Sequence, residues 1–140
     1  MAVEVRHLNP EGMHANPAFT QAVIVSGAAR TVYIGGQNAV APDGRIVGGD
    51  DLAAQTEQVC ANLATVLAAA GGTLHDIIKL TICVVQGQDL RRGFGVFQRI
   101  WGAEQPPPAI TVLTVAGLAN PAFLVEVEAI AIIGSGGAGA

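Results

Sequence analysis

The strongest pattern of apolar and polar positions lies in the last third of the chain, from Phe123 to Ile133. This segment is rich in apolar and β-branched residues, which predicts a long final strand. Because successive side chains of a strand face opposite ways, one of its faces is wholly apolar. The other face carries Glu126 and Glu128, about 7 Å apart. An unpaired carboxylate is costly to bury, so these two either reach solvent, are paired or hydrogen-bonded, or line a cleft.

Alternating and β-branched segments predict further strands, with glycine, proline and asparagine marking the loops between them. We expect these strands at residues 3–8, 19–25, 31–36, 78–85 and between Pro108 and the final strand. Ser26 and Gly27 turn the chain, so the strands at 19–25 and 31–36 are expected to form a hairpin.

Two segments have the period of a helix. The first is expected to start after Asp51 and to end near Ala70, because an aspartate caps a helix and Gly71-Gly72 stops one. Its apolar stripe is predicted at Leu52, Thr56, Val59, Leu63, Val66 and Ala70. The second starts after Asp89, with its stripe at Leu90, Phe94, Phe97 and Trp101.

The order of these elements indicates an α+β fold, a mixed β-sheet with two helices packed on one face. The length is that of one domain, which we expect to span residues 1–133. The glycine-rich end, residues 134–140, has too little apolar surface to pack and is expected to be a disordered tail.

Composition adds an expectation about assembly. The chain is 51% hydrophobic and only 13% charged, whereas an average domain is about 25% charged. Both faces of the strand at 80–85 are mostly apolar, and two helices can cover only one face of a small sheet. The other face therefore predicts contact with further copies of the chain, that is, an obligate homo-oligomer.

Charge and motifs exclude several function classes. The net charge is −4 and the seven cations are scattered, which argues against nucleic-acid binding. No run of 18 apolar residues and no leader pattern is present, so neither a membrane span nor a signal peptide is predicted. Cys60 and Cys83 suit buried free thiols in a reducing compartment, so a cytoplasmic location is expected. The three dispersed histidines predict no metal site, and the sequence contains no HExxH, CxxC or GxSxG motif.

Six short segments occur together in a recognisable order. They are Gly35-Gly36-Gln37, Gln55 with Asn62-Leu63, Ala69-Ala70-Gly71-Gly72, residues 76–81, Pro108-Ala109 and residues 125–131. In this order and at these spacings, over roughly residues 15–133, the chain resembles the RidA/YjgF family, whose members are also called L-PSP endoribonucleases.

The resemblance implies a homotrimer with a chorismate-mutase-like fold, a barrel core and three clefts between subunits. The best-known family activity is hydrolysis of reactive 2-imino or 2-enamino acids to 2-keto acids and ammonia, with no metal or organic cofactor. In that activity an arginine after Pro-Ala holds the substrate carboxylate, and a carboxylate on the last strand positions a water.

Transferred to this chain, the resemblance makes Glu126 the catalytic, water-positioning carboxylate. Phe19 matches an aromatic residue that lines the cleft, and Gly36 and Gln37 match the segment beside the ligand. Glu128 lies on the same strand face as Glu126 and could take its role.

Two positions depart from the family pattern. Ile110 follows Pro108-Ala109 where the family has its arginine, and Phe94 stands where the family usually has an asparagine. An alkyl group cannot replace a guanidinium fork, and losing that pair would weaken carboxylate binding by roughly 1.5–3 kcal/mol. Phe94 and Ile110 are therefore expected to give the substrate site a more apolar wall, suited to a less anionic ligand. Arg6, Arg30 or an arginine of a neighbouring subunit could restore the lost charge.

Three functions remain open from the sequence. The first is a small-molecule hydrolase or deaminase acting on an imine, an enamine or a related labile metabolite. The second is a trimer without catalysis that binds a small metabolite or a partner protein, which the missing arginine favours. The third is the ribonuclease activity in the family's name, which is the weakest because the acidic chain has no basic groove.

Overall fold

The computed structural model describes residues 2–134 of the chain. In chain order the elements are β1 (Glu4–Leu8), β2 (Ala22–Ser26), β3 (Ala29–Gln37), α1 (Leu52–Ala69), the 3₁₀ turn η1 (Leu74–Asp76), β4 (Ile77–Val85), α2 (Leu90–Trp101), β5 (Ala109–Val115) and β6 (Val125–Gly134). Gly134, the first residue of the predicted tail, is thus the last residue of β6. The rest of that tail, residues 135–140, lies outside the described residues.

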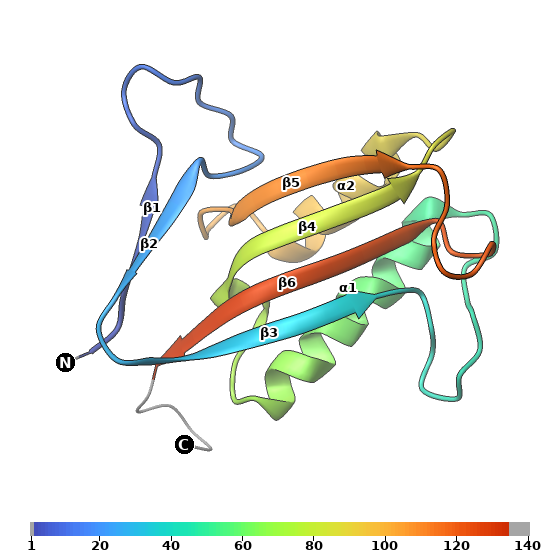
Figure 1. Ribbon diagram of the computed structural model, residues 1–140, viewed down its shortest axis with the longest axis horizontal. Coiled ribbons are helices and arrows are strands. Elements are labelled where there is room, and N and C mark those ends of the chain that lie inside the picture. Colours follow the sequence, from blue (N-terminus) through green and yellow to red (C-terminus); the bar gives the residue numbers. More distant parts are fainter. Residues whose placement is uncertain (1, 135–140) are drawn as a thin grey trace.

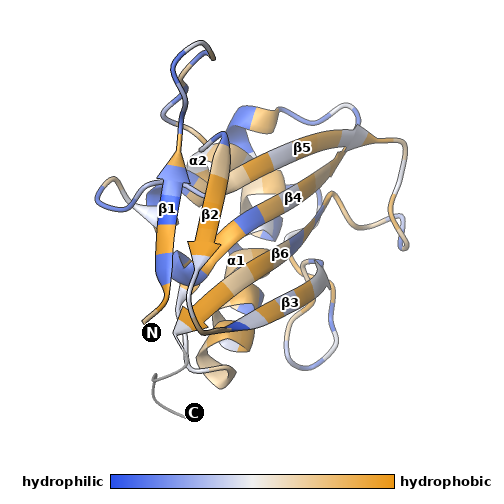
Figure 2. Ribbon diagram, turned by 60° about the vertical axis from the view of Figure 1, so that its left-hand side comes forward, coloured by the Kyte–Doolittle hydropathy of each residue, from blue (hydrophilic) through white to orange (hydrophobic). Residues whose placement is uncertain are grey.

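The main sheet has four strands in the order β3-β6-β4-β5. β6 runs antiparallel to both of its neighbours, and β5 runs parallel to β4. Both helices lie on the same side of this sheet (Figure 1). The predicted α+β class, a mixed sheet with two helices on one face, is confirmed. The strands β4, β5 and β6 are coloured mostly as hydrophobic in Figure 2, although the helices cover only one side of the sheet.

The alternation predicted for the last strand is confirmed. Its helix-facing side chains are each at most 5% exposed, namely Val125, Val127, Ala129, Ala131 and Ile133. On the opposite face, Glu126 is half-buried and Glu128 is exposed. We call this second side the open face of the sheet, because neither helix lies on it (Figure 1).

Both predicted helices are present, and both aspartate caps are confirmed. The Asp51 side chain accepts a hydrogen bond from the Ala53 amide, and the Asp89 side chain accepts one from the Arg91 amide. The predicted apolar stripes are only partly right. On α1, Leu67 is fully buried, whereas Val66 and Ala70 are half-buried. An α-helix has 3.6 residues per turn, whereas the predicted spacing, alternating between four and three, averages 3.5. Residues at the predicted spacing therefore rotate gradually away from the sheet along α1.

On α2 the predicted stripe is right at its C-terminal half and wrong at its start. Phe97 and Trp101 are buried and stack with their ring centroids 5.9 Å apart. Leu90 is 42% exposed and Phe94 is half-buried, because α2 covers the sheet next to its edge strand β5.

The expected hairpin between residues 19–25 and 31–36 is wrong. β2 pairs with β1 in a separate two-stranded sheet, and β3 pairs with β6. Gly27, at φ 89°, lets the chain turn sharply between them, and a Cβ there would overlap the carbonyl oxygen of Ala2. β3 takes β6 as its partner because this pairing places Val32 and Ile34 over α1, in the core.

The two cysteines are free thiols, Cys60 buried in α1 and Cys83 half-buried in β4. Within residues 2–134, neither helix is long and apolar enough to cross a membrane.

A buried glutamine joins α1 to two loops. Gln55 is fully buried, and its amide nitrogen donates hydrogen bonds to the carbonyls of Gly49 and Ala122, both at 2.9 Å. Its amide oxygen accepts a bond from the Leu124 backbone, also at 2.9 Å. Gln55 thereby ties the start of α1 to the segment that leads into β6.

Replacing this side chain by an apolar one of similar length is expected to be costly. Gln55→Met leaves three backbone groups without their partner, so we expect a loss of about 3 kcal/mol or more in the free energy of unfolding. Gln58→Met is the matched control, because Gln58 lies on the same helix and donates one side-chain bond, to Asn62. Urea denaturation followed by circular dichroism measures both variants, and equal losses would contradict the role of Gln55.

Candidate functional site

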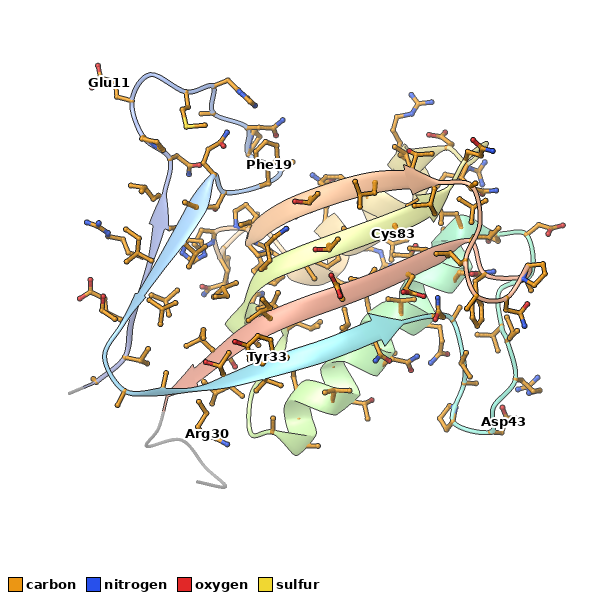
Figure 3. The ribbon with its side chains drawn as sticks, viewed as in Figure 1. Glu11, Phe19, Arg30, Tyr33, Asp43 and Cys83 are labelled. Carbon is orange, nitrogen blue, oxygen red and sulfur yellow. The ribbon has the colours of Figure 1, made fainter. Side chains whose placement is uncertain are left out.

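The open face of the sheet carries an oriented carboxylate. Glu126 of β6 lies opposite Cys83 of β4, and its Oε1 accepts a hydrogen bond of 3.1 Å from the side-chain amide of Asn38. The same amide nitrogen donates to the Val125 carbonyl at 3.2 Å. Figure 3 shows Cys83 on the side of the sheet turned away from the helices. One amide group thus holds both the backbone and the carboxylate at this point of β6.

Asn38 is itself anchored by α1. Its carbonyl accepts a hydrogen bond of 3.1 Å from the side chain of Asn62, which also donates to the Val40 carbonyl at 3.1 Å. The Asn62 oxygen accepts a bond of 2.9 Å from Gln58. These contacts connect Glu126 to a helix on the other side of the sheet. Asn38 is not among the residues predicted from the sequence, although it directly follows Gln37 and its anchor Asn62 belongs to the family-like pattern.

Gly36 makes room for the carboxylate. A Cβ at this position would lie 2.5 Å from Oε2 and 2.8 Å from Cδ of Glu126. β3 is also irregular here, since its register with β6 shifts between Ile34 and Gln37. The glycine is needed for close approach of the backbone to the carboxylate.

Gln37 is a neighbour of this group. It pairs with Val127 in the sheet, and its side-chain amide donates to the Gly35 carbonyl at 3.1 Å. The structure therefore brings Gly36, Gln37 and Glu126 into one region, with Asn38 as the link.

The other three predicted residues lie elsewhere on the protomer. Ile110 of β5 pairs with the fully buried Leu80 and packs against the core on the helix side of the sheet. Phe94 of α2 borders a hollow of about 310 Å³ together with Pro17 and Ala18.

Phe19 belongs to the same region as this hollow. It precedes Thr20, whose amide donates to the Pro108 carbonyl at 3.0 Å, and Figure 3 shows it near the start of β5. Its ring meets the edge of His14, with centroids 6.0 Å apart. Within one protomer the six residues thus form two groups, and the sheet separates Ile110 from Glu126.

Two further charged side chains, Lys79 and Glu128, lie on the open face together with the Cys83 thiol. The Lys79 ammonium donates hydrogen bonds to Thr111 Oγ1 at 2.8 Å and to the Leu80 carbonyl at 3.0 Å. Burial lowers the pKa of Lys79, and the negative charge of Glu128 opposes this shift. Burial also raises the pKa of the Cys83 thiol, and Glu126 and Glu128 raise it further. Cys83 therefore stays a neutral thiol rather than a nucleophilic thiolate at neutral pH.

The arrangement around Glu126 suits proton transfer. A carboxylate with one oxygen held by an amide can accept a proton from a water molecule, or keep that water in place. Among residues 2–134, no three histidine, cysteine, aspartate or glutamate side chains are grouped so that they could hold a metal ion.

Comparison with known proteins decides the family. The family model described as Endoribonuclease L-PSP matches residues 2–133. The chain belongs to the RidA/YjgF family. It is 35% identical over 105 residues to a RutC family protein of Pyrococcus horikoshii, covering 74% of this chain and 80% of that protein.

Two further relatives are informative. The 2-iminobutanoate/2-iminopropanoate deaminase of Rattus norvegicus is 32% identical over 120 residues, which cover 84% of this chain and 81% of the enzyme. The crystal structure of YyfB from Yersinia pestis, described as a Rid family protein of unknown function, superposes with a TM-score of 0.82. That pair shares 38% identity, over 92% of this chain and 98% of YyfB.

The contact between Gly36 and Glu126 can be tested directly. Gly36→Ala places a methyl group where Oε2 lies, so the carboxylate must move and the Asn38 bond must lengthen or break. We expect displaced NMR resonances for the Glu126 carboxyl carbon and the Asn38 side-chain amide. Overpacking is also expected to cost about 1–3 kcal/mol of stability.

Gly35→Ala is the matched control, because a Cβ on that neighbouring glycine meets nothing within 4 Å. Its Glu126 and Asn38 resonances should stay in place. Equal displacement in the two variants would show that strand β3, and not the contact with Glu126, is responsible.

Proposed function

We propose that this protein is a cofactor-free hydrolase that deaminates a small imine, enamine or related labile metabolite, with Glu126 as general base. The observation that carries the proposal is the Glu126 carboxylate, held by Asn38 and approached closely by the Gly36 backbone. The sequence identity of 32% with two proteins named 2-iminobutanoate/2-iminopropanoate deaminase supports the reaction class.

In this reaction Glu126 accepts a proton from water while the water oxygen adds to the imine carbon. The C=N double bond becomes a single bond, and protonated Glu126 gives its proton to the nitrogen, which regenerates the carboxylate. The C–N bond then breaks as the proton of the new hydroxyl group passes to the departing nitrogen, so ammonia leaves and the carbonyl forms. The sum is imine plus water giving carbonyl compound plus ammonia, so no electrons are exchanged with a cofactor.

The complete site requires more than one copy of the chain. Ile110 and Glu126 lie on opposite faces of the sheet, so a cleft lined by both needs residues from two subunits. Large apolar side chains are exposed on β3 and β5, with Tyr33 78% and Leu113 46% exposed, which supports association through the open face. We propose a homotrimer with the ligand in clefts between subunits, where Phe19, Gln37 and Phe94 complete the walls.

We also propose a cytoplasmic location, because the two cysteines of the chain are free thiols, as is usual in a reducing compartment.

The substrate is proposed to be less anionic or more apolar than an imino acid. At the position of the family's arginine, Ile110 packs its alkyl side chain against the core and offers no charge. This same observation favours one alternative, a trimer that binds a metabolite without turning it over. Ligand-dependent stabilisation without ammonia release would distinguish that alternative.

The role of Glu126 predicts a specific loss of turnover. Glu126→Gln removes the proton acceptor, so we expect ammonia release to fall by about 100-fold or more, in the range of general-base catalysis. Glu128→Gln is the matched control, since it changes the same residue type on the same strand face. Undiminished turnover in Glu126→Gln, or equal loss in both variants, would exclude Glu126 as the base.

The role of Ile110 predicts a change of preference between substrates. Two probes are compared, freshly generated 2-iminopropanoate and its uncharged ethyl ester. We expect the native protein to favour the ester, and Ile110→Arg to shift kcat/KM towards the carboxylate by about tenfold or more. Ile110→Met controls for the altered packing without adding charge. A native protein that already prefers the carboxylate would mean that another cation binds it.

A further inference from the structure

The protomer contains a deep apolar pocket between the two helices and the sheet. Its volume is about 380 Å³. Its floor is formed by Val59, Leu63, Val125 and Val127, all 5% exposed or less. Its mouth lies at the start of α2 and the edge strand β5, where Leu90 is 42% and Val112 45% exposed. The pocket therefore reaches from the surface into the core of the domain.

The size of the pocket is that of a ligand site. Small-molecule pockets have volumes of about 300–1,000 Å³, and an engineered apolar cavity of about 150 Å³ in another protein binds benzene. A pocket two and a half times larger has room for about 10–15 non-hydrogen atoms by the same scale. Two aromatic side chains, Phe94 and Phe97, form part of the wall on α2 and supply flat contact surface.

The polar groups of the pocket are already engaged or neutral. The Thr56 hydroxyl donates to the Leu52 carbonyl at 2.7 Å, within α1. Burial raises the pKa of the Cys60 thiol to about 11, so it is uncharged at neutral pH. Arg91 and Gln98, the remaining polar residues of the lining, are exposed on α2, and Arg91 forms a salt bridge of 3.1 Å with Asp89. The buried part of the lining therefore offers a charged ligand no free partner, and burying such a charge would be costly.

This pocket is separate from the carboxylate of the proposed reaction. Val125 and Val127 line it, and Glu126 between them points to the opposite face of the sheet. A molecule in the pocket thus does not touch Glu126 of the same protomer.

Close packing of the helices frames the pocket. A Cβ on Gly93 of α2 would lie 3.2 Å from Thr56 Oγ1 and 3.4 Å from the Leu52 side chain. This glycine lets α2 approach the start of α1, and the Phe97–Trp101 stack fixes the other end of α2. The walls are set by these contacts within the protomer, which favours a preformed site.

We propose that this pocket binds an uncharged, largely apolar small molecule of about the size of two fused aromatic rings. The proposal goes beyond the deaminase function, because it depends neither on Glu126 nor on turnover.

The test uses naphthalene as the probe and naphthalene-2-sulfonate as its charged counterpart, with the full-length native protein. Methyl NMR should show saturable shifts at Val59, Leu63 and Val127 with naphthalene, at least tenfold weaker with the sulfonate. No saturable shift at these methyls would overturn the proposal, and would mean that the space is filled from within or by a neighbouring copy. Equal affinity for the two probes would also overturn it.

Two neighbouring variants locate the site. Val112→Phe fills the mouth and is expected to weaken naphthalene binding at least tenfold. Leu113→Phe introduces the same aromatic side chain one residue later on β5, on the open face and at similar exposure, and should leave the affinity within twofold. Equal effects of the two variants would overturn the assignment.

A second mouth variant and a catalytic variant complete the test. If Val112→Phe does not fold, Leu90→Phe blocks the mouth from α2 and carries the same expectation. Glu126→Gln should bind naphthalene as the native protein does, whatever its turnover. Loss of naphthalene binding in Glu126→Gln would show that the pocket and the carboxylate are one site, contrary to the proposal.

Discussion

Gln55 is the contact on which the geometry of the candidate site depends. Its buried amide bonds three backbone groups, in the loop before α1 and in the segment before β6. These bonds fix where β6 begins, because Leu124 immediately precedes its first residue. Glu126 is two residues further on, so its position relative to α1 follows from the same anchor. Asn62, two turns along α1, holds Asn38 in place against Glu126 from the other side. One helix thus positions both the carboxylate and its hydrogen-bond donor.

The two-residue period of β6 divides the protein into two chemical environments. Val125 and Val127 close the floor of an apolar pocket, whereas Glu126 between them faces the open side of the sheet beside Cys83. A shift of one residue in the register would bury two carboxylates in the core, at a cost far above the stability of a small domain. The register is therefore fixed by the same residues that separate the candidate catalytic face from the pocket.

Local sequence patterns predicted the elements well, and distant contacts explain what they missed. The caps at Asp51 and Asp89 and the alternation of β6 depend on neighbours within four residues, so the sequence alone indicated them. The partner of β3 lies about a hundred residues away, and the apparent hairpin with β2 was wrong because burial over α1 favours β6. The bond from Asn38 to Glu126 spans 88 positions, and no periodicity indicates such a pair.

Ile110 and Phe94, the two predicted site residues expected to make the site more apolar, lie away from the carboxylate. Both are on the helix side of the sheet, Ile110 packed against the core and Phe94 in the wall of the apolar pocket. An alkyl and an aromatic group offer no polar partner to an anionic ligand, and they extend apolar surface already present there. The open face carries the carboxylate, its amide donor and the glycine that admits it. Because successive residues of β6 face opposite ways, a substitution on the helix side can change the apolar surface without moving Glu126 or its bond to Asn38.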